Sequence, residues 1–284
     1  MNTKRVLITG ANSGMGLAST IELAKRGYEV IMGCRNEERG QKALQEARDK
    51  SGSDQISLMK CDLGSLQHIR EFAEQFNQKY DRLDVLLNNA GVVNLKRHET
   101  ADGFEMSIGV NHLGHFLLTH LLLDALKSSP QGRIVVVSSG AYKIGKIHWD
   151  DPYLHNGYTV IKSYAQSKIA NIFFTRVMAD KLKDTNITIN CLHPGAVATN
   201  IGVDRDTGFG KRILAGVAYL PFFQTPEQGA ETAIFLADDS SVAQSSGLYY
   251  YRKKIHKLKP KALDDAEALR FWEWSQEQVG LQEQ

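Results

Sequence analysis

The sequence has few cysteines and no long apolar run, and each scarcity excludes a class of protein. Its 284 residues contain three cysteines, Cys34, Cys61 and Cys191, which are widely spaced and form no CxxC or His/Cys cluster. We therefore expect reduced thiols in a cytoplasmic protein that binds no metal. The most apolar helical run, from Phe116 to Leu126, is far too short to span a bilayer. The periodic apolar pattern starts at Val6, so we also expect no signal peptide.

The sequence also lacks a large excess of either positive or negative charge. The chain has 34 basic and 32 acidic residues, and the resulting net charge of +2 gives no electrostatic argument for binding nucleic acid. With 42% hydrophobic and 23% charged residues, the composition is that of an ordinary soluble globular protein. Because no Pro/Gly/Ser-rich linker, internal repeat or low-complexity block divides the chain, residues 1–284 are predicted to form one domain.

Short apolar runs alternate with amphipathic helical patterns along most of the chain. Runs rich in Val, Ile and Leu predict strands at 4–9, 28–33, 55–61, 83–87, 133–137, 187–191 and 247–251. Helical periodicity predicts helices at 16–26, 37–50, 65–79, 104–127, 158–183 and 264–279. Near-continuous apolar strands between helices are typical of a parallel sheet that is buried on both faces. We therefore predict an α/β fold, a single doubly wound Rossmann domain whose parallel sheet has about seven strands with helices on both faces.

Two regions fall outside this alternation. Residues 199–225 form a long connection with many apolar and aromatic side chains. We predict that they either close as a lid over an apolar substrate or complete the core, and the two interpretations have equal support. A C-terminal extension, 252–284, begins with RKKIHKLKPK (252–261), which holds six basic residues. A solvated hairpin or loop is favoured there over contact with an anionic membrane surface or partner.

A glycine-rich turn follows the first predicted strand. The stretch from Thr9 to Gly16, TGANSGMG, has the spacing G-x-x-x-G-x-G. Gly10 permits a tight turn, Gly14 lets a pyrophosphate approach the backbone, and Gly16 lets the helix pack closely on the sheet. The helix that follows presents free N–H groups to phosphate. In a strand–turn–helix unit, this pattern predicts a dinucleotide-binding site.

The end of the second predicted strand indicates which dinucleotide binds. An NAD site needs an acidic residue there for the ribose 2′-hydroxyl, but the chain reads Gly33-Cys34-Arg35-Asn36. A guanidinium pairs with a 2′-phosphate, which a carboxylate would repel. Arg35 therefore predicts NADP(H) as the cofactor, with a solvated surface arginine as the alternative.

A tyrosine and a lysine four residues apart on a helix share one face. Because the lysine cation favours the phenolate, such a pair predicts a lowered pKa for the tyrosine. Such a phenol can exchange protons with an alcohol or carbonyl. Five Tyr-x-x-x-Lys pairs occur, at 142/146, 158/162, 164/168, 249/253 and 250/254. The last two lie in a strand, where four residues span about 13 Å, and Gly145 places the first in a loop. Tyr164/Lys168 is favoured, and Tyr158/Lys162 stays open as a rival because it falls at the predicted helix start.

Seven motifs in this order resemble the short-chain dehydrogenase/reductase family over nearly the whole chain. They are TGANSGMG (9–16), CDL (61–63), NNAG (88–91), GVNHLGHF (109–116), VSS (137–139), YAQSK (164–168) and HPG (193–195). Within the family, FEMSIGVNHLGHFLLT and the tail DDAEALRFWEWS are similar to the retinol dehydrogenase and protochlorophyllide reductase neighbourhood. The gap between Ser139 and Tyr164 is longer than in many members. A small insertion around Lys146–Gly157 is therefore expected, and the oligomeric state stays open.

The resemblance implies a role for each catalytic residue. Tyr164 is expected to be the general acid/base, and Lys168 to lower its pKa and bind the nicotinamide ribose. Ser139 is expected to hold the substrate oxygen, and Asn111 to keep a water behind Lys168. These four residues make up the predicted catalytic set.

The resemblance also implies the cofactor contacts. The pyrophosphate is expected at Thr9, Gly10, Asn12, Ser13, Gly14, Met15 and Gly16, beside Arg35. The adenine and adenosine contacts are expected at Asp62, Leu63, Asn88, Ala90 and Gly91. The nicotinamide is expected against Tyr164, Lys168, Pro194, Gly195, Val197 and Thr199.

His112 and His115, three residues apart on a predicted helix, have no Glu-x-x-His pattern beside them, so a packed or cofactor-adjacent role is favoured over metal binding.

From the glycine-rich turn, Arg35 and the predicted catalytic set, we predict an NADP(H)-dependent oxidoreductase that interconverts an apolar carbonyl compound, an aldehyde or ketone, and its alcohol. The alternative is a non-catalytic NADP(H)-responsive binding protein on the same fold. The predicted partner is a small-molecule substrate, with no nucleic acid and no transmembrane segment.

Overall fold

The fold is described from a computed structural model, which covers residues 3–196 and 224–281. Val197, Thr199 and the predicted lid up to residue 223 lie outside the described residues. The described part contains no helix that is long and apolar enough to cross a membrane.

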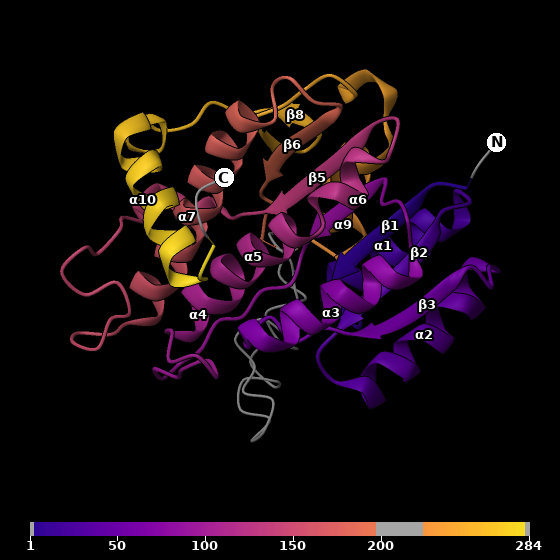
Figure 1. Ribbon diagram of the computed structural model, residues 1–284, viewed down its shortest axis with the longest axis horizontal. Coiled ribbons are helices and arrows are strands. Elements are labelled where there is room, and N and C mark those ends of the chain that lie inside the picture. The colour runs from indigo at the N-terminus through magenta and orange to yellow at the C-terminus, as the bar shows by residue number, and fades with distance from the viewer. Residues whose placement is uncertain (1–2, 197–223, 282–284) are drawn as a thin grey trace.

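One eight-stranded sheet forms the centre of the molecule (Figure 1). Its order is β3-β2-β1-β4-β5-β6-β7-β8, and every pair is parallel except the last. The strands are β1 (Arg5–Thr9), β2 (Glu29–Cys34), β3 (Ile56–Lys60), β4 (Val85–Asn88), β5 (Gly132–Val137), β6 (Ile187–Leu192), β7 (Tyr249–Tyr251) and β8 (Lys254–Ile255). The predicted fold class is confirmed, with one strand more than expected. The additional strand, β8, arises because Arg252 and Lys253 have φ values of 51° and 62°, which turn the chain back along β7.

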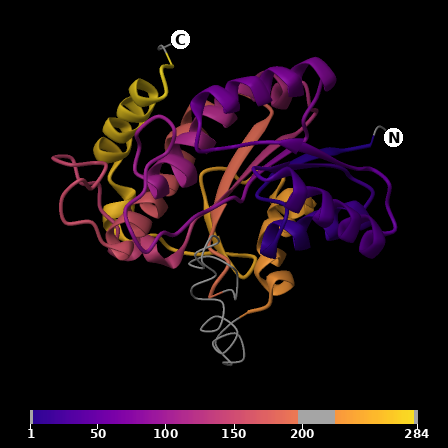
Figure 2. The same cartoon turned by 90° about the horizontal axis from the view of Figure 1, so that it is seen from below.

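Helices cover both faces of the sheet. The helices of the described chain are α1 (Gly14–Lys25), α2 (Glu37–Ser51), α3 (Leu66–Lys79), α4 (Met106–Ile108), α5 (Gly114–Leu121), α6 (Leu123–Lys127), α7 (Val160–Lys181), α9 (Pro226–Asp238) and α10 (Asp265–Gln278). Shorter turns are the π-helix η1 (Gly109–Leu113) and the 3-10 helices η2 (Gly140–Ile144), η3 (Ser240–Val242) and η4 (Pro260–Leu263). Helices α1, α2 and α9 pack on one face, and α3, α5, α7 and α10 pack on the other (Figure 2). The two faces bury separate apolar clusters, so the sheet is the middle of three layers.

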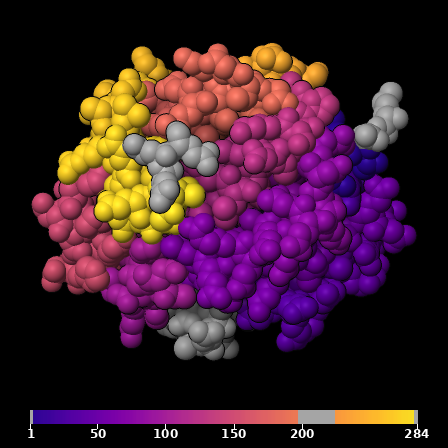
Figure 3. Space-filling view, viewed as in Figure 1, coloured from indigo at the N-terminus to yellow at the C-terminus, as the bar shows by residue number. Residues whose placement is uncertain are grey.

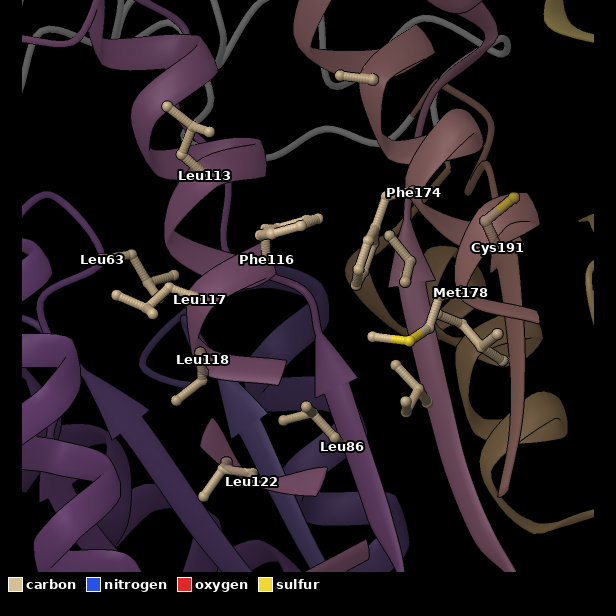
Figure 4. Close-up of a cluster of buried hydrophobic side chains, with 14 of the residues drawn as sticks. Leu63, Leu86, Leu113, Phe116, Leu117, Leu118, Leu122, Phe174, Met178 and Cys191 are labelled. Carbon is tan, nitrogen blue, oxygen red and sulfur yellow. The ribbon is translucent and has the colours of Figure 1, made fainter. Parts of the chain in front are cut away.

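The helix predicted at 104–127 is wrong as a single helix. The chain forms α4, the π-turn η1, α5 and α6 in succession. A Cβ on Gly109 would lie 2.5 Å from the side chain of Thr100, and one on Gly114 would lie 2.5 Å from the carbonyl oxygen of Leu63. These close approaches flank the π-turn, which places Asn111 on a widened backbone. Figure 4 shows the core that this segment builds, where Phe116 meets Phe174 of α7 at 5.4 Å between ring centroids.

Two helices near the C-terminus complete the layers. Helix α9, which the sequence patterns did not predict, begins with a capping box in which Thr225 and Gln228 bond each other's backbone N–H. Helix α10 packs on α7, its Trp272 meets Phe116 of α5, and its outer side lies at the surface of the molecule (Figure 3); Phe271 and Trp272 are its large buried side chains. Side chains of the expected insertion, Trp149 and Tyr153, donate hydrogen bonds to α10, so this segment is held against the C-terminal helix.

Strand order reverses between β1 and β4, because the chain runs outward from β1 through β2 and β3 and then returns to β4 on the other side. In doubly wound sheets, ligands bind at the carboxyl ends of the strands next to such a reversal. The fold therefore directs attention to the loops after β1, β4 and β5.

Candidate active site

The turn between β1 and α1 is shaped by its glycines. Gly10 has a φ of +65°, and its N–H donates to the carbonyl oxygen of Gly33 at 2.8 Å. A Cβ on Gly10 would lie 2.9 Å from Ala90 Cα, and one on Gly16 would lie 2.4 Å from the carbonyl oxygen of Gly10. No side chain fits at either position. Gly10 thus makes the tight turn, and Gly16 permits the close packing of α1 that its place in the sequence predicts.

The N-terminus of α1 is left open to a ligand. Ser13 occupies the N-cap position, yet its side chain accepts no hydrogen bond from the helix, and the first turn carries no acidic residue. By contrast, the side chains of Asn36 and Ser65 cap α2 and α3. The first N–H groups of α1 therefore remain available to an anion such as a pyrophosphate.

A cavity of about 130 Å³ lies beside this turn. Twelve of the predicted cofactor residues line it: Thr9, Gly10, Asn12, Ser13, Gly14, Met15, Gly16, Arg35, Asp62, Leu63, Ala90 and Gly91. Its remaining lining was not predicted and consists of Gly33, Cys61, Asn89, Val92 and Val110. The glycine cradle, the open helix N-terminus and the cationic rim fit the adenosine and pyrophosphate parts of a dinucleotide.

The prediction for Asn88 is wrong. Its side chain is buried, and its Nδ2 donates to Thr119 Oγ1 at 2.9 Å, away from the cavity. The neighbouring Asn89 lines the cavity instead, and its Nδ2 donates to the carbonyl oxygen of Thr9 at 2.8 Å. Adjacent residues at the end of a strand point to opposite faces, so a register error of one residue exchanges the two asparagines.

Thr9 joins the loops after β1 and β4. Its Oγ1 accepts from the N–H groups of Asn89 and Ala90 at 2.9 and 3.0 Å and lies 2.8 Å from His115 Nε2. His115 Nδ1 lies 3.2 Å from the carbonyl oxygen of Asn111, which only accepts, so Nδ1 carries the proton and Nε2 accepts from Thr9. Burial lowers the pKa of His115 to about 4 and keeps this ring neutral. His115 is thus a positioning residue of the site that the sequence patterns left undefined.

Arg35 follows β2 directly and lies exposed at the rim of the cavity. In the described part of the chain its guanidinium forms no salt bridge. Its neighbour Asn36 is engaged as the N-cap of α2, which fixes where the strand ends. The exposed guanidinium therefore forms the cationic part of the cavity rim.

Tyr164 and Lys168 lie one turn apart near the start of α7. Lys168 is buried, with its Nζ 5.3 Å from the centre of the Tyr164 ring. The ammonium donates to the carbonyl oxygen of Val137 at 3.1 Å, at the end of β5. Burial lowers the pKa of Lys168 to about 8. The two side chains therefore share one face of α7, with the cation over the ring.

The predicted lowering of the Tyr164 pKa is wrong for this structure. Burial raises the pKa of Tyr164, and a hydrogen bond with Ser139 acts in the opposite direction. The loss of hydration of the phenolate outweighs this hydrogen bond. Lys168 does not offset the loss, because its ammonium lies over the ring and donates a hydrogen bond to the backbone carbonyl oxygen of Val137. Ser139 itself is the N-cap of η2, and its Oγ accepts from the N–H of Ala141 at 3.2 Å. The structure thus brings together the two predicted hydroxyl groups and places the cation beside them.

Asn111 adds a fourth polar group to this corner. Its Oδ1 accepts from the N–H of Val92 at 2.7 Å, and its Nδ2 donates to Ser167 Oγ at 3.0 Å. A Cβ on Gly91 would lie 3.6 Å from Asn111 Oδ1 and 3.8 Å from Lys168 Nζ. Asn111, Gly91 and Lys168 therefore converge at the carboxyl end of β4. The expected water behind Lys168 stays a prediction.

The rival tyrosines are engaged elsewhere. Tyr158 precedes α7, and its hydroxyl donates to the carbonyl oxygen of Asn94 at 2.7 Å, while Lys162 Nζ donates to Gly157. Tyr142 lies in the 3-10 helix η2 rather than in a loop, and it is fully buried. Its hydroxyl accepts from the backbone N–H of Lys259 at 3.3 Å. Neither phenol reaches the cavity.

The histidines and the HPG motif have structural contacts of their own. His112 packs among aromatic rings in the core, and no group of three potential metal ligands occurs within the described residues. His193 Nδ1 accepts from the N–H of Gly195 at 3.2 Å and so holds the turn that contains Pro194. This turn follows β6, next to β5 and Ser139, which is compatible with the predicted contact of Pro194 and Gly195 with a nicotinamide.

The geometry is that of a proton-transfer site beside a dinucleotide-type cavity at the switch point of the sheet. The sequence model described as short chain dehydrogenase matches residues 4–208. The chain therefore belongs to the short-chain dehydrogenase family and is an oxidoreductase of that family.

Individual relatives show which members of this family the chain is similar to. The chain is 45% identical to mouse retinol dehydrogenase 14, over 99% of this chain and 87% of the relative. It is 39% identical to human retinol dehydrogenase 13, over 98% of this chain and 85% of the relative. Among solved structures, a protein from Mycobacterium paratuberculosis is 29% identical, with a TM-score of 0.78 over 98% of this chain and 94% of that chain. A short-chain dehydrogenase from Shigella flexneri, solved with NADP, shares the fold at 24% identity, with a TM-score of 0.68 over 89% of this chain and 98% of the other.

Proposed function

We propose that the protein is an NADP(H)-dependent oxidoreductase that interconverts an apolar aldehyde or ketone and its alcohol. The observation that carries the proposal is the convergence of Ser139, Tyr164 and Lys168 at the end of β5. A phenol beside a hydroxyl and a buried cation is suited to proton transfer at a carbonyl oxygen.

The chain's own residues supply the proton chemistry. The nicotinamide, when bound, supplies or accepts the hydride. Tyr164 donates a proton to the carbonyl oxygen during reduction and accepts it during oxidation, while Ser139 holds that oxygen in place. Lys168, buried over the ring, stabilises negative charge on the phenol when the proton leaves. Gly91 has no side chain beside the ammonium and Asn111 Oδ1, so the space next to them is open.

NADP(H) is proposed over NAD(H) because of Arg35. The cavity rim carries its exposed guanidinium directly after β2, where an NAD site needs a carboxylate. A 2′-phosphate would pair with this cation, and no acidic side chain at the end of β2 would repel the phosphate.

An apolar substrate is proposed because the relatives that match nearly the whole chain are named retinol dehydrogenases. All three cysteines are free and buried, and a cytoplasmic location stays a prediction.

The test is NADPH consumption over a panel of aldehydes, ketones and quinones, with the wild-type protein and Tyr164→Phe side by side. The wild type is expected to turn over apolar carbonyl compounds. Loss of the acid/base should lower kcat about 10²- to 10⁴-fold while NADPH binding, measured by fluorescence, persists. Cofactor binding without turnover, together with no effect of Tyr164→Phe, would favour the non-catalytic binding protein instead.

A further inference from the structure

A buried acidic side chain lies between two elements of the candidate active site and takes no part in the proposed proton transfer. Glu105 is fully buried and directly precedes α4 and η1, the segment that carries Asn111. This segment packs against α7, the helix of Tyr164 and Lys168. An acidic side chain is rarely buried without hydrogen-bond partners, so the partners of Glu105 indicate what it holds in place.

The first partners of Glu105 are at the start of α4. Its Oε1 accepts from the N–H of Ser107 at 2.9 Å, and its Oε2 accepts from the N–H of Ile108 at 3.1 Å. Glu105 is therefore the N-cap of the segment that leads through the π-turn to Asn111. N-caps are usually serine, threonine, aspartate or asparagine, whose short side chains bond the first turn of their own helix. Glutamate is one methylene group longer than aspartate, so its carboxylate can also reach a neighbouring helix.

The neighbouring helix that Glu105 reaches is α7. Ser163 Oγ donates to Glu105 Oε1 at 2.9 Å and lies 2.6 Å from Ser107 Oγ. One turn further along α7, Ser167 Oγ accepts from Asn111 Nδ2 at 3.0 Å. We call these five buried residues the polar seam: Glu105, Ser107, Asn111, Ser163 and Ser167. The polar seam joins α7 to the segment from 105 to 111 at two points.

The two serines that α7 contributes to the polar seam directly precede the acid/base pair. Ser163 is followed by Tyr164, and Ser167 is followed by Lys168. Positions i and i+4 lie on one face of a helix, and the next residue in each case lies about 100° further around the axis. Fixing the two serines therefore also fixes the direction in which Tyr164 and Lys168 point.

We propose that Glu105 is a positioning residue for the acid/base pair. Its carboxylate links the start of α4 to Ser163 and thereby sets the rotation of α7 that turns Tyr164 toward Ser139. Glu105 acts through Ser163 and exchanges no proton with the substrate. The kinetic consequence of this role rests on the proposed function, whereas the contact between Tyr164 and Ser139 that it maintains can be examined without turnover.

The size of the effect follows from the geometry of a helix. At the outer radius of a helix, about 6 Å, a rotation of about 10° moves the tip of a side chain by about 1 Å. A displacement of about 1 Å in an active site can lower a rate about 100-fold. Loss of the link should therefore slow the chemical step. Binding of NADPH at the turn between β1 and α1 should persist, because this turn belongs to other elements.

Two variants break the link from opposite sides. Ser163→Ala removes the hydroxyl on α7 and leaves the N-cap of α4 intact. Glu105→Asp keeps a capping carboxylate but is about 1.5 Å shorter, so it should no longer reach Ser163. Each variant should lower kcat for carbonyl reduction about 10- to 100-fold and leave the Kd for NADPH unchanged. The control Thr175→Val removes another buried hydroxyl of α7, about 10 Å along the helix from Lys168, and should keep the wild-type kcat.

The double variant Glu105→Asp/Ser163→Ala and a crystal structure complete the test. If both changes act through one contact, the kcat of the double variant should equal that of the more impaired single variant. In the crystal structure of Ser163→Ala, the hydroxyl of Tyr164 should lie outside hydrogen-bond distance of Ser139. The positioning role is overturned by an unchanged contact between Tyr164 and Ser139, by losses that multiply in the double variant, or by an equal loss in Thr175→Val. A wild type that reduces no carbonyl compound would refute the proposed function, and the crystal structure would still decide the positioning role.

Discussion

His112 gives a quantitative test of the core that supports the site. It is buried, with its Nε2 2.9 Å from Ser275 Oγ and its ring 4.9 Å from that of Phe271. The Ser275 hydroxyl donates to the carbonyl oxygen of Phe271 at 2.7 Å, so it accepts from His112 Nε2–H. A second proton on Nδ1 would be a buried charge, and the side chain of Asn171 only partly offsets the cost of that burial. Burial accordingly lowers the pKa of His112 to about 3.

The sign and size of the effect follow from linkage. The unfolded chain binds a proton on this residue below about pH 6.5, whereas the folded protein binds it only near pH 3. Stability is therefore complete above pH 6.5 and falls as the pH is lowered toward 3. At about 1.4 kcal/mol for each pH unit, the contribution of His112 to the loss between pH 7.5 and 4.5 is about 3 kcal/mol.

Urea unfolding followed by tryptophan fluorescence at pH 7.5 and 4.5 measures this loss. In His112→Phe, which keeps an aromatic ring in the cluster, the fall in unfolding free energy should be smaller than in the wild type by about 3 kcal/mol. His115 and His120, whose pKa values burial also lowers to about 4, remain in both proteins and cancel in the comparison. The exposed His68→Gln serves as the control and should behave like the wild type. An equal fall in His112→Phe and the wild type would refute the reasoning.

Three further predictions concern the site itself. Arg35→Glu should reverse the preference for NADPH over NADH, measured as the ratio of the two kcat/KM values. The control Lys42→Glu, at an exposed position on α2, should leave this ratio unchanged. An unaltered ratio in Arg35→Glu would disprove the proposal that Arg35 selects NADP(H). Gly16→Ala places a Cβ 2.4 Å from the carbonyl oxygen of Gly10 and should raise the Kd for NADPH about 10- to 100-fold by fluorescence titration, and an unchanged Kd would argue against the cradle. Tyr158→Phe should keep kcat within about twofold and lose about 1 kcal/mol of stability, and a large fall in kcat would restore it as a candidate acid/base.

The parts of the site predicted from the sequence are those that short-range physics determines. Gly10 has a positive φ and Gly16 has no room for a Cβ, and both requirements are local to a strand–turn–helix unit. The fold class followed from the alternation of apolar runs with helical patterns, because a parallel sheet buried on both faces requires that composition. Helix α9 was open to prediction, since Thr225, Pro226 and Gln228 form a recognisable start signal.

Other features depend on contacts that no local pattern contains. The π-turn at Asn111 arises where Gly109 packs against Thr100 and Gly114 packs against Leu63, and Leu63 is distant in sequence. The exchange of Asn88 and Asn89 reflects the exact end of β4, a property of the register of the sheet. The hydrogen bond of His115 with Thr9 joins residues 106 positions apart. Such features follow from tertiary packing.

The raised pKa of Tyr164 changes the reasoning about its chemistry. The sequence predicted a phenol tuned toward the phenolate, but burial raises the pKa of this one. A phenol with a raised pKa holds its proton more strongly, and the protonated form is the one that donates to a carbonyl oxygen. Oxidation needs the phenolate, and the cation that would stabilise it, Lys168, is itself disfavoured by burial. We therefore interpret the Lys168 ammonium over the ring as a group that stabilises the Tyr164 phenolate after the phenol has donated its proton. Catalysis needs the positive charge at this stage, because negative charge develops on the phenol oxygen as the proton leaves.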